Sequence, residues 1–272
     1  NYILSKEIPN NKRVYILRPC MIHGPKNKGN LNLLYSFISK GIPYPFGKYE
    51  NKRSFVSVEN LCFIINELID NANIASGIYN NVLVIGADTF SKITDWTRRD
   101  AIFFGDGAGA AVLTSANVTE GFLAYRLYTD TSNEMLGFTI PGGGSEIPLT
   151  KNNMNEQYFQ MNGRSVFNSA TKALPKAINE VLEDTGLIID DIDIMIPHQP
   201  SIRILKKTAE IINLPFDKVM TNMDKYANTS GGTIPILLDE LNKSNKLKEG
   251  DNVLFAAVGS GWTYGASIIK WG

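Results

Sequence analysis

Two polar side chains, His198 and Asn228, stand where they could act on the same substrate atom. His198 follows the apolar run 194–197, which is typical of a buried strand that delivers a polar side chain at its tip. Asn228 lies thirty residues later, in a loop that leads into a helix. Both side chains can donate a hydrogen bond while uncharged, and two donors aimed at one point stabilise a carbonyl oxygen that gains negative charge. The pattern therefore predicts enolate chemistry.

Either residue could instead have a structural role. A lone histidine is often a hydrogen-bonded core residue, and an asparagine before Thr229 and Ser230 is a good helix N-cap. For catalysis the imidazole of His198 must be neutral and protonated on Nε2, so we expect a neighbouring group to hydrogen-bond its Nδ1. Removing one such donor costs about 3 kcal/mol of transition-state stabilisation, or roughly a hundredfold in rate.

Four motifs give these residues a family context, and they lie at 104–110, 197–199, 228–232 and 259–265. In this order and spacing they resemble the last part of the β-ketoacyl-acyl carrier protein synthases III, which are condensing enzymes of the thiolase fold. The resemblance runs from about Val82 to Gly272. It implies an α/β thiolase-like layered fold with a partial N-terminal half and a complete C-terminal half.

The resemblance also implies an acyltransferase of fatty-acid or polyketide type. The family joins an acyl group to malonyl-acyl carrier protein in a decarboxylative Claisen condensation. His198 and Asn228 match the two donors that hold the enolate oxygen, and the backbone N–H of Ser260 matches an oxyanion-hole donor. The family usually has glycine where Ser260 stands, and serine leaves the N–H available unless the backbone needs a positive φ.

Three further positions match the family's binding site for coenzyme A. Gly163 and Phe167 match positions that line the pantetheine tunnel, and Arg99 matches an arginine near the adenine, although one residue is missing just after it. Pro200 and Ser201 replace the family's alanine and asparagine after the histidine motif. One asparagine contact to the pantetheine arm is therefore lost, which leaves the preferred acyl chain and donor open.

Three basic residues after Ser201 form a candidate patch. Arg203, Lys206 and Lys207 share one helix face because they are three and four residues apart. Such a face suits a solvated flank equally well, but the resemblance places Arg203 where the family meets its acidic carrier protein. The resemblance thus implies acyl-CoA, malonyl-acyl carrier protein and acyl carrier protein as partners, a homodimer, and no cofactor beyond the coenzyme A thioester substrate.

The family carries its acyl group on a cysteine, and no cysteine lies between Val82 and Gly272. Cys20 and Cys62 both precede this range, and neither has the strand-to-helix setting in which a helix N-terminus lowers a thiol pKa. We therefore expect that the chain forms no acyl-enzyme. The activity that His198 and Asn228 could still support is a slow decarboxylation of a malonyl thioester. A non-catalytic fragment or binding module is the alternative.

Glycines and helical patterns predict the elements that hold the site. Gly105, Gly107 and Gly109 leave one face of a strand at 102–114 bare, which suits close approach of a backbone or helix better than phosphate binding. A helical pattern covers 165–184, with Pro175 expected to kink the helix and Gly186 expected to end it.

The region after Asp193 predicts a β-α-β-α-β-β order, which is typical of an α/β layered half-domain. Its first helix follows Ser201 and should turn four apolar residues inward, namely Ile202, Leu205, Ala209 and Ile212. A second helix contains Ile234 and Leu241. Closing strands are expected at 253–258 and 266–269.

The first 80 residues have a different character. Residues 18–25 resemble the Arg-Pro-x-x-x-Tyr-Gly-Pro turn of the extended short-chain dehydrogenases that act as nucleotide-sugar epimerases and dehydratases, with His23 at the tyrosine. Residues 53–58 resemble a strand of that family whose arginine, here Arg53, lies near the nucleotide diphosphate. We therefore expect residues 1–80 to be a fragment of such a substrate domain. The glycine-rich dinucleotide fingerprint is absent, so NAD is not supported.

The boundary between this segment and the second domain, 82–272, is abrupt. No Gly, Pro or polar linker separates the strand end at 77–80 from Val82. We hypothesise that two gene fragments are fused here. Because residue 1 is Asn and not Met, we also expect the chain either to begin inside a longer gene product or to have been trimmed.

Composition limits the remaining classes of function. The chain has 27 Lys plus Arg and 27 Asp plus Glu, so its net charge is zero and gives no overall electrostatic attraction to nucleic acid or to an anionic membrane. Two cysteines and two distant histidines predict no metal site. Without an apolar run of about 18 residues or a signal peptide, we expect a soluble cytoplasmic protein.

Overall fold

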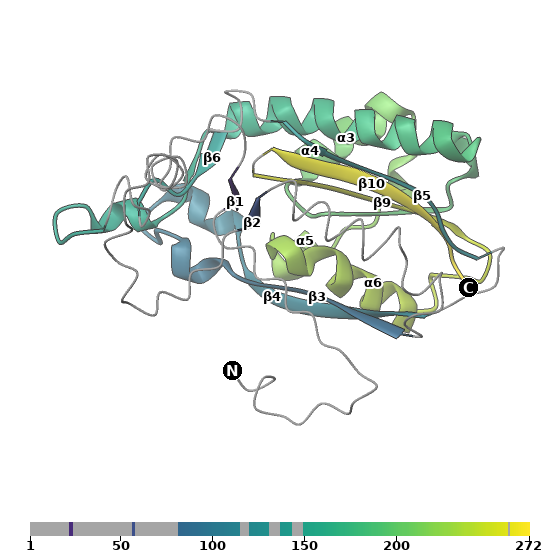
Figure 1. The fold of residues 1–272 in the computed structure, drawn as a ribbon, viewed down its shortest axis with the longest axis horizontal. Coiled ribbons are helices and arrows are strands. Elements are labelled where there is room, and N and C mark those ends of the chain that lie inside the picture. The colour runs from purple at the N-terminus through teal and green to yellow at the C-terminus, as the bar shows by residue number, and fades with distance from the viewer. Residues whose placement is uncertain are drawn as a thin grey trace, which may run out of the picture.

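The computed structural model describes residues 22–23, 56–57, 81–114, 120–130, 137–142, 149–260 and 262–272. Most of this part forms stacked layers of helices and strands (Figure 1). From one side to the other the layers are helices α3 (Gly163–Thr185) and α4 (Ile202–Ile212), a four-stranded sheet, helices α5 (Met223–Tyr226) and α6 (Thr233–Lys243), and a two-stranded ribbon.

The four-stranded main sheet consists of β5 (Gly121–Thr129), β10 (Thr263–Lys270), β9 (Asn252–Gly259) and β8 (Ile194–Pro197), in that order. Strand β10 is antiparallel to both of its neighbours, whereas β8 is parallel to β9. Leu174, Ile178 and Leu205 of the covering helices are almost fully buried against it. The two predicted closing strands are confirmed, and His198 directly follows β8.

Helix α3 confirms the helical pattern predicted at 165–184. The side chain of Asn162 caps its start by accepting a hydrogen bond from Ser165 N at 3.1 Å. Its end falls at Gly186, whose φ of 70° lies in the left-handed region that favours glycine. The helix continues through the buried Pro175 as a single element.

Helix α4 begins after the predicted cap, because Ser201 Oγ accepts a hydrogen bond from Arg203 N. Leu205, Ala209 and Ile212 are buried as predicted. Ile202 is not, since 41% of its surface is exposed. The buried stripe also includes Ile204 and Thr208, which moves its centre away from Ile202 and leaves that residue at the edge, in the first turn.

The predicted strand between α4 and α6 is wrong. Val219 makes only an isolated bridge to Met195, and it follows a short 3-10 helix, η7 (Phe216–Lys218). The chain then enters α5, after the polar pair Thr221 and Asn222. Because these polar residues interrupt the apolar run, no second strand is added to the main sheet.

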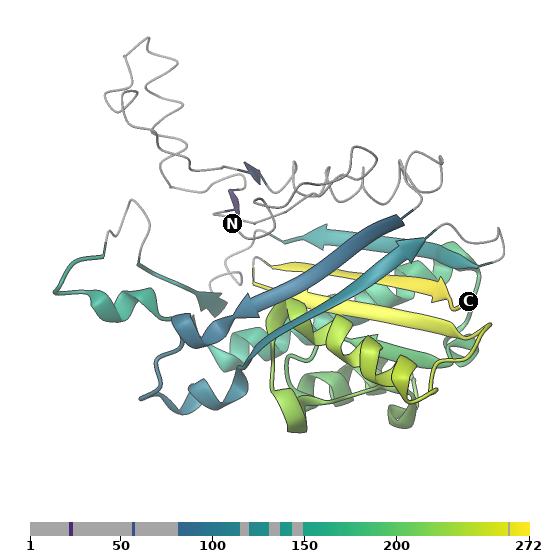
Figure 2. The same cartoon turned by 90° about the horizontal axis from the view of Figure 1, so that it is seen from below.

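The two-stranded ribbon consists of β3 (Asn81–Thr89) and β4 (Asp106–Thr114), which pair antiparallel with Gly86 opposite Gly109. Figure 2 shows the two long strands of this ribbon running side by side on the side of the molecule that carries α6. Their glycines lie against α6 and the loop before it. A Cβ on Gly86 would collide with the carbonyl oxygen of Gly231, and one on Gly107 would lie 2.7 Å from Thr229 Cβ. The predicted packing role of the glycines is therefore confirmed.

The strand predicted at 102–114 begins later than expected. Residues Ile102 and Phe103 belong instead to a 3-10 helix, η3 (Arg99–Phe103), and β4 starts only at Asp106. Another 3-10 helix, η2 (Phe90–Ile93), follows β3. The remaining 3-10 helices are η5 (Met154–Gln157), η6 (Ile189–Asp191) and η8 (Ser230–Gly232).

Two pairs of short strands complete the described part. Strand β6 (Phe138–Thr139) pairs with β7 (Gln160–Met161) just before α3. Strand β1 (Ile22–His23) pairs in parallel with β2 (Val56–Ser57), and these strands lie within the two dehydrogenase-like motifs. The predictions for Arg53, Cys20 and Cys62 concern residues outside the described part of the chain.

Within the described residues, no helix has the length and apolarity that a membrane crossing requires.

Candidate functional site

His198 is fixed at the end of β8 by hydrogen bonds from both its backbone and its ring. Its backbone N–H donates to Ala256 O at 2.8 Å, and its Nδ1 lies 2.7 Å from Thr233 Oγ1. Burial lowers the pKa of the ring to about 4, and a contact with the Ser230 backbone offsets this shift only in part. The imidazole is therefore neutral near pH 7, as enolate stabilisation requires.

Asn228 is held in place by the ribbon side of the molecule. Its backbone N–H donates to Phe103 O and its carbonyl accepts from Gly105 N, both at 3.0 Å. Its side chain is 8% exposed, and its Oδ1 accepts a hydrogen bond from Ser230 N at 2.8 Å. Because a backbone N–H can only donate, this bond fixes the amide orientation and leaves Nδ2 as the outward donor.

Ser230 joins the two candidate donors through its backbone. Its N–H donates to Asn228 Oδ1, while its carbonyl oxygen accepts a hydrogen bond from the backbone N–H of Thr233 and lies 2.8 Å from Thr233 Oγ1. The φ of Ser230 is 52°, a left-handed value that is uncommon for a residue with a side chain. The structure thus brings His198 and Asn228 together through Thr233 and Ser230.

The loop that carries Asn228 is fastened at both ends. On its far side, Gly231 N donates to Asp88 Oδ2 at 2.8 Å. On its near side, the Glu240 carboxylate of α6 accepts hydrogen bonds from three residues of the preceding segment, namely Asn222, Lys225 and Tyr226. The bond from Asn222 is the main cause that lowers the pKa of Glu240. The loop is therefore positioned by β3 and by α6 together.

Ser260 lies beyond β9 and contacts a different element. Its Oγ donates to Phe138 O in β6 at 2.8 Å. Positive φ values at non-glycine residues occur, within the described part of the chain, at Asn213, Ala227, Ser230 and Asn245. Ser260 does not share this geometry, so its backbone does not require glycine. No contact in the described residues joins Ser260 to His198, and its oxyanion role stays a prediction.

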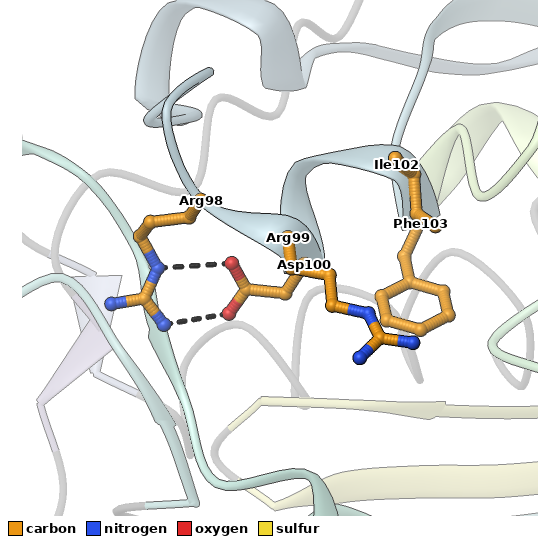
Figure 3. Close-up of a pocket in the computed structure, with 5 residues that line it drawn as sticks. All are labelled: Arg98, Arg99, Asp100, Ile102 and Phe103. Atoms are coloured by element: carbon orange, nitrogen blue, oxygen red, sulfur yellow. Dashed lines mark hydrogen bonds and ion pairs between the residues drawn. The ribbon is translucent and has the colours of Figure 1, made fainter.

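An open pocket of about 490 Å³ surrounds Arg99, and Arg98, Asp100, Ile102 and Phe103 complete its lining. Arg98 forms two hydrogen bonds to Asp100, at 2.9 and 2.6 Å, which lower the pKa of that carboxyl (Figure 3). The guanidinium of Arg99 lies beside the Phe103 ring in the same view. Since Phe103 O also bonds Asn228 N, this pocket adjoins the Asn228 loop directly.

The remaining predicted binding residues lie on α3 and α4. Gly163 is the first residue of α3 and has open space where a side chain would stand. The Phe167 ring lies 5.6 Å below the Arg203 guanidinium, which joins the predicted tunnel to the predicted basic patch. Lys206 lies over the Phe216 ring at 5.6 Å, and Lys207 pairs with Glu210 at 2.7 Å.

Sequence reasoning missed two parts of this site. Thr233 carried no signal beyond its place after the glycine pair 231–232. Among the pocket residues, Phe103 was overlooked because a strand was expected at 102–114, and Arg98 was not singled out. The Arg-Arg-Asp run at 98–100 is a detectable signal for an anion pocket. Among the described residues, no cluster of histidine, cysteine, aspartate or glutamate could hold a metal ion.

Comparison with known families gives two matches. The model described as "3-Oxoacyl-[acyl-carrier-protein (ACP)] synthase III C terminal" matches residues 182–271. The model described as "3-Oxoacyl-[acyl-carrier-protein (ACP)] synthase III" matches residues 62–131. The second match begins at Cys62, so it reaches into the segment predicted to resemble the dehydrogenases. That resemblance remains a prediction.

Individual relatives agree with the family models. The β-ketoacyl-[acyl-carrier-protein] synthase III of Chlorobium luteolum is 40% identical over 203 residues, which cover 73% of this chain and 61% of the relative. The crystal structure of the Aquifex aeolicus 3-oxoacyl-[acyl-carrier-protein] synthase III is 34% identical with a TM-score of 0.66, and the match covers 89% of this chain and 71% of that one.

The corresponding Thermus thermophilus structure is 30% identical with a TM-score of 0.67, and the match covers 88% of this chain and 72% of that one. The similarity to both structures supports a thiolase-like layered fold. The chain spans about three fifths of the length of the first curated relatives that it matches, with 61% and 60% covered.

Proposed function

The chain belongs to the 3-oxoacyl-[acyl-carrier-protein] synthase III family, and we propose that it decarboxylates a malonyl thioester at His198 and Asn228. The observation that carries this proposal is the hydrogen-bonded connection of the two side chains through Thr233 and Ser230. It gives two neutral groups fixed orientations in one small region. Fixed donors stabilise developing negative charge without reorganising during the reaction.

The chemistry follows from the atoms that these donors offer. When the bond between the malonyl α-carbon and its carboxylate breaks, carbon dioxide leaves and the electron pair moves onto the thioester oxygen as an enolate. Nε2–H of His198 and Nδ2–H of Asn228 would each donate a hydrogen bond to this oxygen. The enolate carbon then attacks the carbonyl of an acyl thioester, whose C–S bond breaks, and the thiolate of the acyl donor leaves with the electron pair. Without an acyl donor, the enolate takes a proton and gives an acetyl thioester.

The substrate and its carrier would use the residues around the pocket. Arg99 and the Phe103 ring offer a cation and an aromatic face to the nucleotide end of coenzyme A. Gly163 and Phe167 would line the path of the pantetheine arm. Arg203 supports both roles because it lies over Phe167, and with Lys206 and Lys207 it presents positive charge to an acidic acyl carrier protein.

The same proposal includes malonyl-acyl carrier protein and acyl-CoA as substrates, a cytoplasmic location and a homodimer. It includes no cofactor. We retain the prediction that no acyl-enzyme forms. Labelled acetyl-CoA followed by mass spectrometry of the intact protein tests this prediction, with Cys62→Ser and Cys20→Ser as matched variants. A stable acetyl adduct that disappears only in Cys62→Ser would overturn it.

Carbon dioxide release from malonyl-acyl carrier protein tests the proposed activity directly. The wild-type chain is expected to release it faster than the buffer control, and His198→Ala is expected to lose roughly a hundredfold of that rate. Equal release by the wild type and the buffer control would contradict the proposal. Thr208→Val is a suitable control, since it changes a buried threonine on α4 whose hydroxyl forms no hydrogen bond in the described part of the chain.

A second candidate concerns residues 1–80. The parallel pairing of β1 with β2 joins two residues of one dehydrogenase-like motif to two residues of the other, which supports the predicted epimerase or dehydratase fragment. Arg53 would then bind a nucleotide sugar. Isothermal titration with UDP-glucose tests this, and absence of binding by the wild-type chain would contradict it.

A further inference from the structure

The hydroxyl group of Thr233 stands between two acceptors. Thr233 opens helix α6 and is 3% exposed, so water does not compete for its hydroxyl. Its Oγ1 lies 2.7 Å from His198 Nδ1 and 2.8 Å from Ser230 O. A hydroxyl has one hydrogen, so it can donate to only one of the two at a time.

Each choice fixes a different tautomer of His198. If the hydroxyl donates to Ser230 O, then Nδ1 must carry the ring proton and donate to Oγ1, which leaves Nε2 as a bare acceptor. If the hydroxyl donates to Nδ1, then Nε2 carries the proton and becomes the outward donor. The position of one hydrogen therefore decides whether His198 offers a base or a hydrogen-bond donor to the substrate.

Ser230 O does not depend on the Thr233 hydroxyl. It already accepts the backbone N–H of Thr233 at the start of α6. His198 Nδ1 makes its hydrogen bond with Thr233 Oγ1. The Ser230 backbone also contacts the ring, but its carbonyl oxygen can only accept a hydrogen bond. An unprotonated, buried Nδ1 would therefore have no donor if Thr233 did not donate to it, and such a nitrogen is costly. The ring with its proton on Nε2 thus requires donation from Thr233.

We propose that Thr233 is a positioning residue whose hydroxyl donates to His198 Nδ1 and thereby holds the ring in the tautomer with a proton on Nε2. This inference deepens the proposed function and rests on it for its catalytic consequence. The tautomer itself can be measured without any substrate. Thr233 would not contact the substrate, because its hydroxyl is occupied by the imidazole.

Nitrogen-15 NMR of the full-length chain tests the tautomer without any substrate. The chain has two histidines, so His23→Gln leaves the signals of His198 alone. The wild type is expected to show a protonated Nε2 and an unprotonated Nδ1 at neutral pH. A protonated Nδ1 in the wild type would overturn the proposal, whatever the variants do.

Three variants separate positioning from packing. Thr233→Val keeps the shape of the side chain and removes the hydroxyl, so it should yield a mixture of tautomers and a decarboxylation rate at least tenfold lower, by roughly the loss of one buried hydrogen bond. Thr233→Ser keeps the hydroxyl and should restore both. Thr208→Val removes a buried hydroxyl that has no partner in the described structure, and it should change neither.

The two readouts distinguish the two proposals. A shift of tautomer in Thr233→Val without any malonyl decarboxylation by the wild type would leave the positioning role intact and contradict the proposed function. A decarboxylation rate unchanged in Thr233→Val, with an unchanged NMR spectrum, would overturn the positioning role and leave the function standing. Failure of Thr233→Ser to restore the tautomer would also overturn it.

Discussion

The main sheet and the ribbon of β3 and β4 differ sharply in how well they are packed. Leu205, above the main sheet, is 1% exposed, whereas Leu83 in β3 is 59% exposed. His198 is attached to the main sheet by its backbone bond to Ala256. Asn228 is attached by its backbone to Phe103 and Gly105, beside the start of β4. The two proposed donors therefore depend on regions of unequal packing.

This difference indicates which half of the site is the more vulnerable. The geometry of His198 should persist as long as the main sheet is folded. The geometry of Asn228 also requires that the ribbon stays docked against α6 and the loop before it, through close contacts at Gly86, Gly107 and Gly109. Loss of docking would separate the donors before the main sheet unfolds.

Alanine substitutions in the two regions should give the largest contrast. Leu205→Ala removes a fully buried side chain and should lower the free energy of unfolding by about 3 kcal/mol. Leu83→Ala changes an exposed side chain and should alter it by less than about 0.5 kcal/mol. Urea unfolding measures both. An equally large loss for Leu83→Ala would show that the ribbon is covered in solution and would remove the contrast.

A side chain on Gly86 should undock the ribbon. Gly86→Val places its Cβ against Gly231 O and should lower stability by about 2 kcal/mol through overpacking. It should also abolish decarboxylation, because the Asn228 loop is displaced. Gly163→Ala is the matched control for stability, since its Cβ meets open space, and it should change stability by less than about 0.5 kcal/mol. Full activity in Gly86→Val would contradict the coupling of ribbon and loop.

The pH dependence of stability should report the burial of His198 on the main-sheet side. Burial lowers the pKa of this ring from 6.5 to about 4, so the folded state binds the proton less well than the unfolded state. The stability that the neutral ring provides is fully present above about pH 6.5. As the pH falls toward 4, the free energy of unfolding should decrease by about 1 to 3 kcal/mol, because the unfolded state takes up the proton first. Unfolding curves of the wild type should show this loss. His198→Gln should remove it and His23→Gln should keep it.

The Glu240 contacts on the loop side should have the smallest effect. Glu240→Gln weakens the bonds from Asn222, Lys225 and Tyr226 and should cost less than about 1 kcal/mol, since the carboxylate is partly solvated. The pKa of Glu240 is lowered below 4.5, so the contribution is present above pH 4.5 and disappears as the pH falls through the folded pKa.

Asp239→Asn is the matched control for this change. Asp239 directly precedes Glu240 on the same helix and its ion pair with Lys243 is exposed, so its loss should leave the free energy of unfolding almost unchanged. A larger cost for Asp239→Asn than for Glu240→Gln would show that Glu240 does not hold the loop.

The sequence predicted the elements whose signals are local. Helix α3 followed from apolar periodicity and the stop at Gly186, and the bare face of β4 followed from its alternating glycines. The exposed Ile202 was misjudged because periodicity locates a stripe but not its centre. The predicted strand between α4 and α6 was misjudged because a short apolar run does not distinguish a strand from the single bridge that Val219 makes.

The sequence predicted only those site residues whose type and position indicate a chemical role. His198 and Asn228 could be named because neutral donors at a strand tip and a loop suggest one function. Thr233 could not, since its role depends on a distance of 2.7 Å to a residue 35 positions away. The role of Ser230 lies in its backbone, which its residue type does not reveal.

A double-mutant cycle on malonyl decarboxylation tests most directly whether His198 and Asn228 bind one oxygen. Rates of carbon dioxide release are compared for the wild type, His198→Ala, Asn228→Ala and the double variant. Each single change should cost roughly a hundredfold, and the double change should cost clearly less than the product, because donors to one atom act as a unit. Strictly multiplicative losses, or a wild-type rate in Asn228→Ala, would contradict the account.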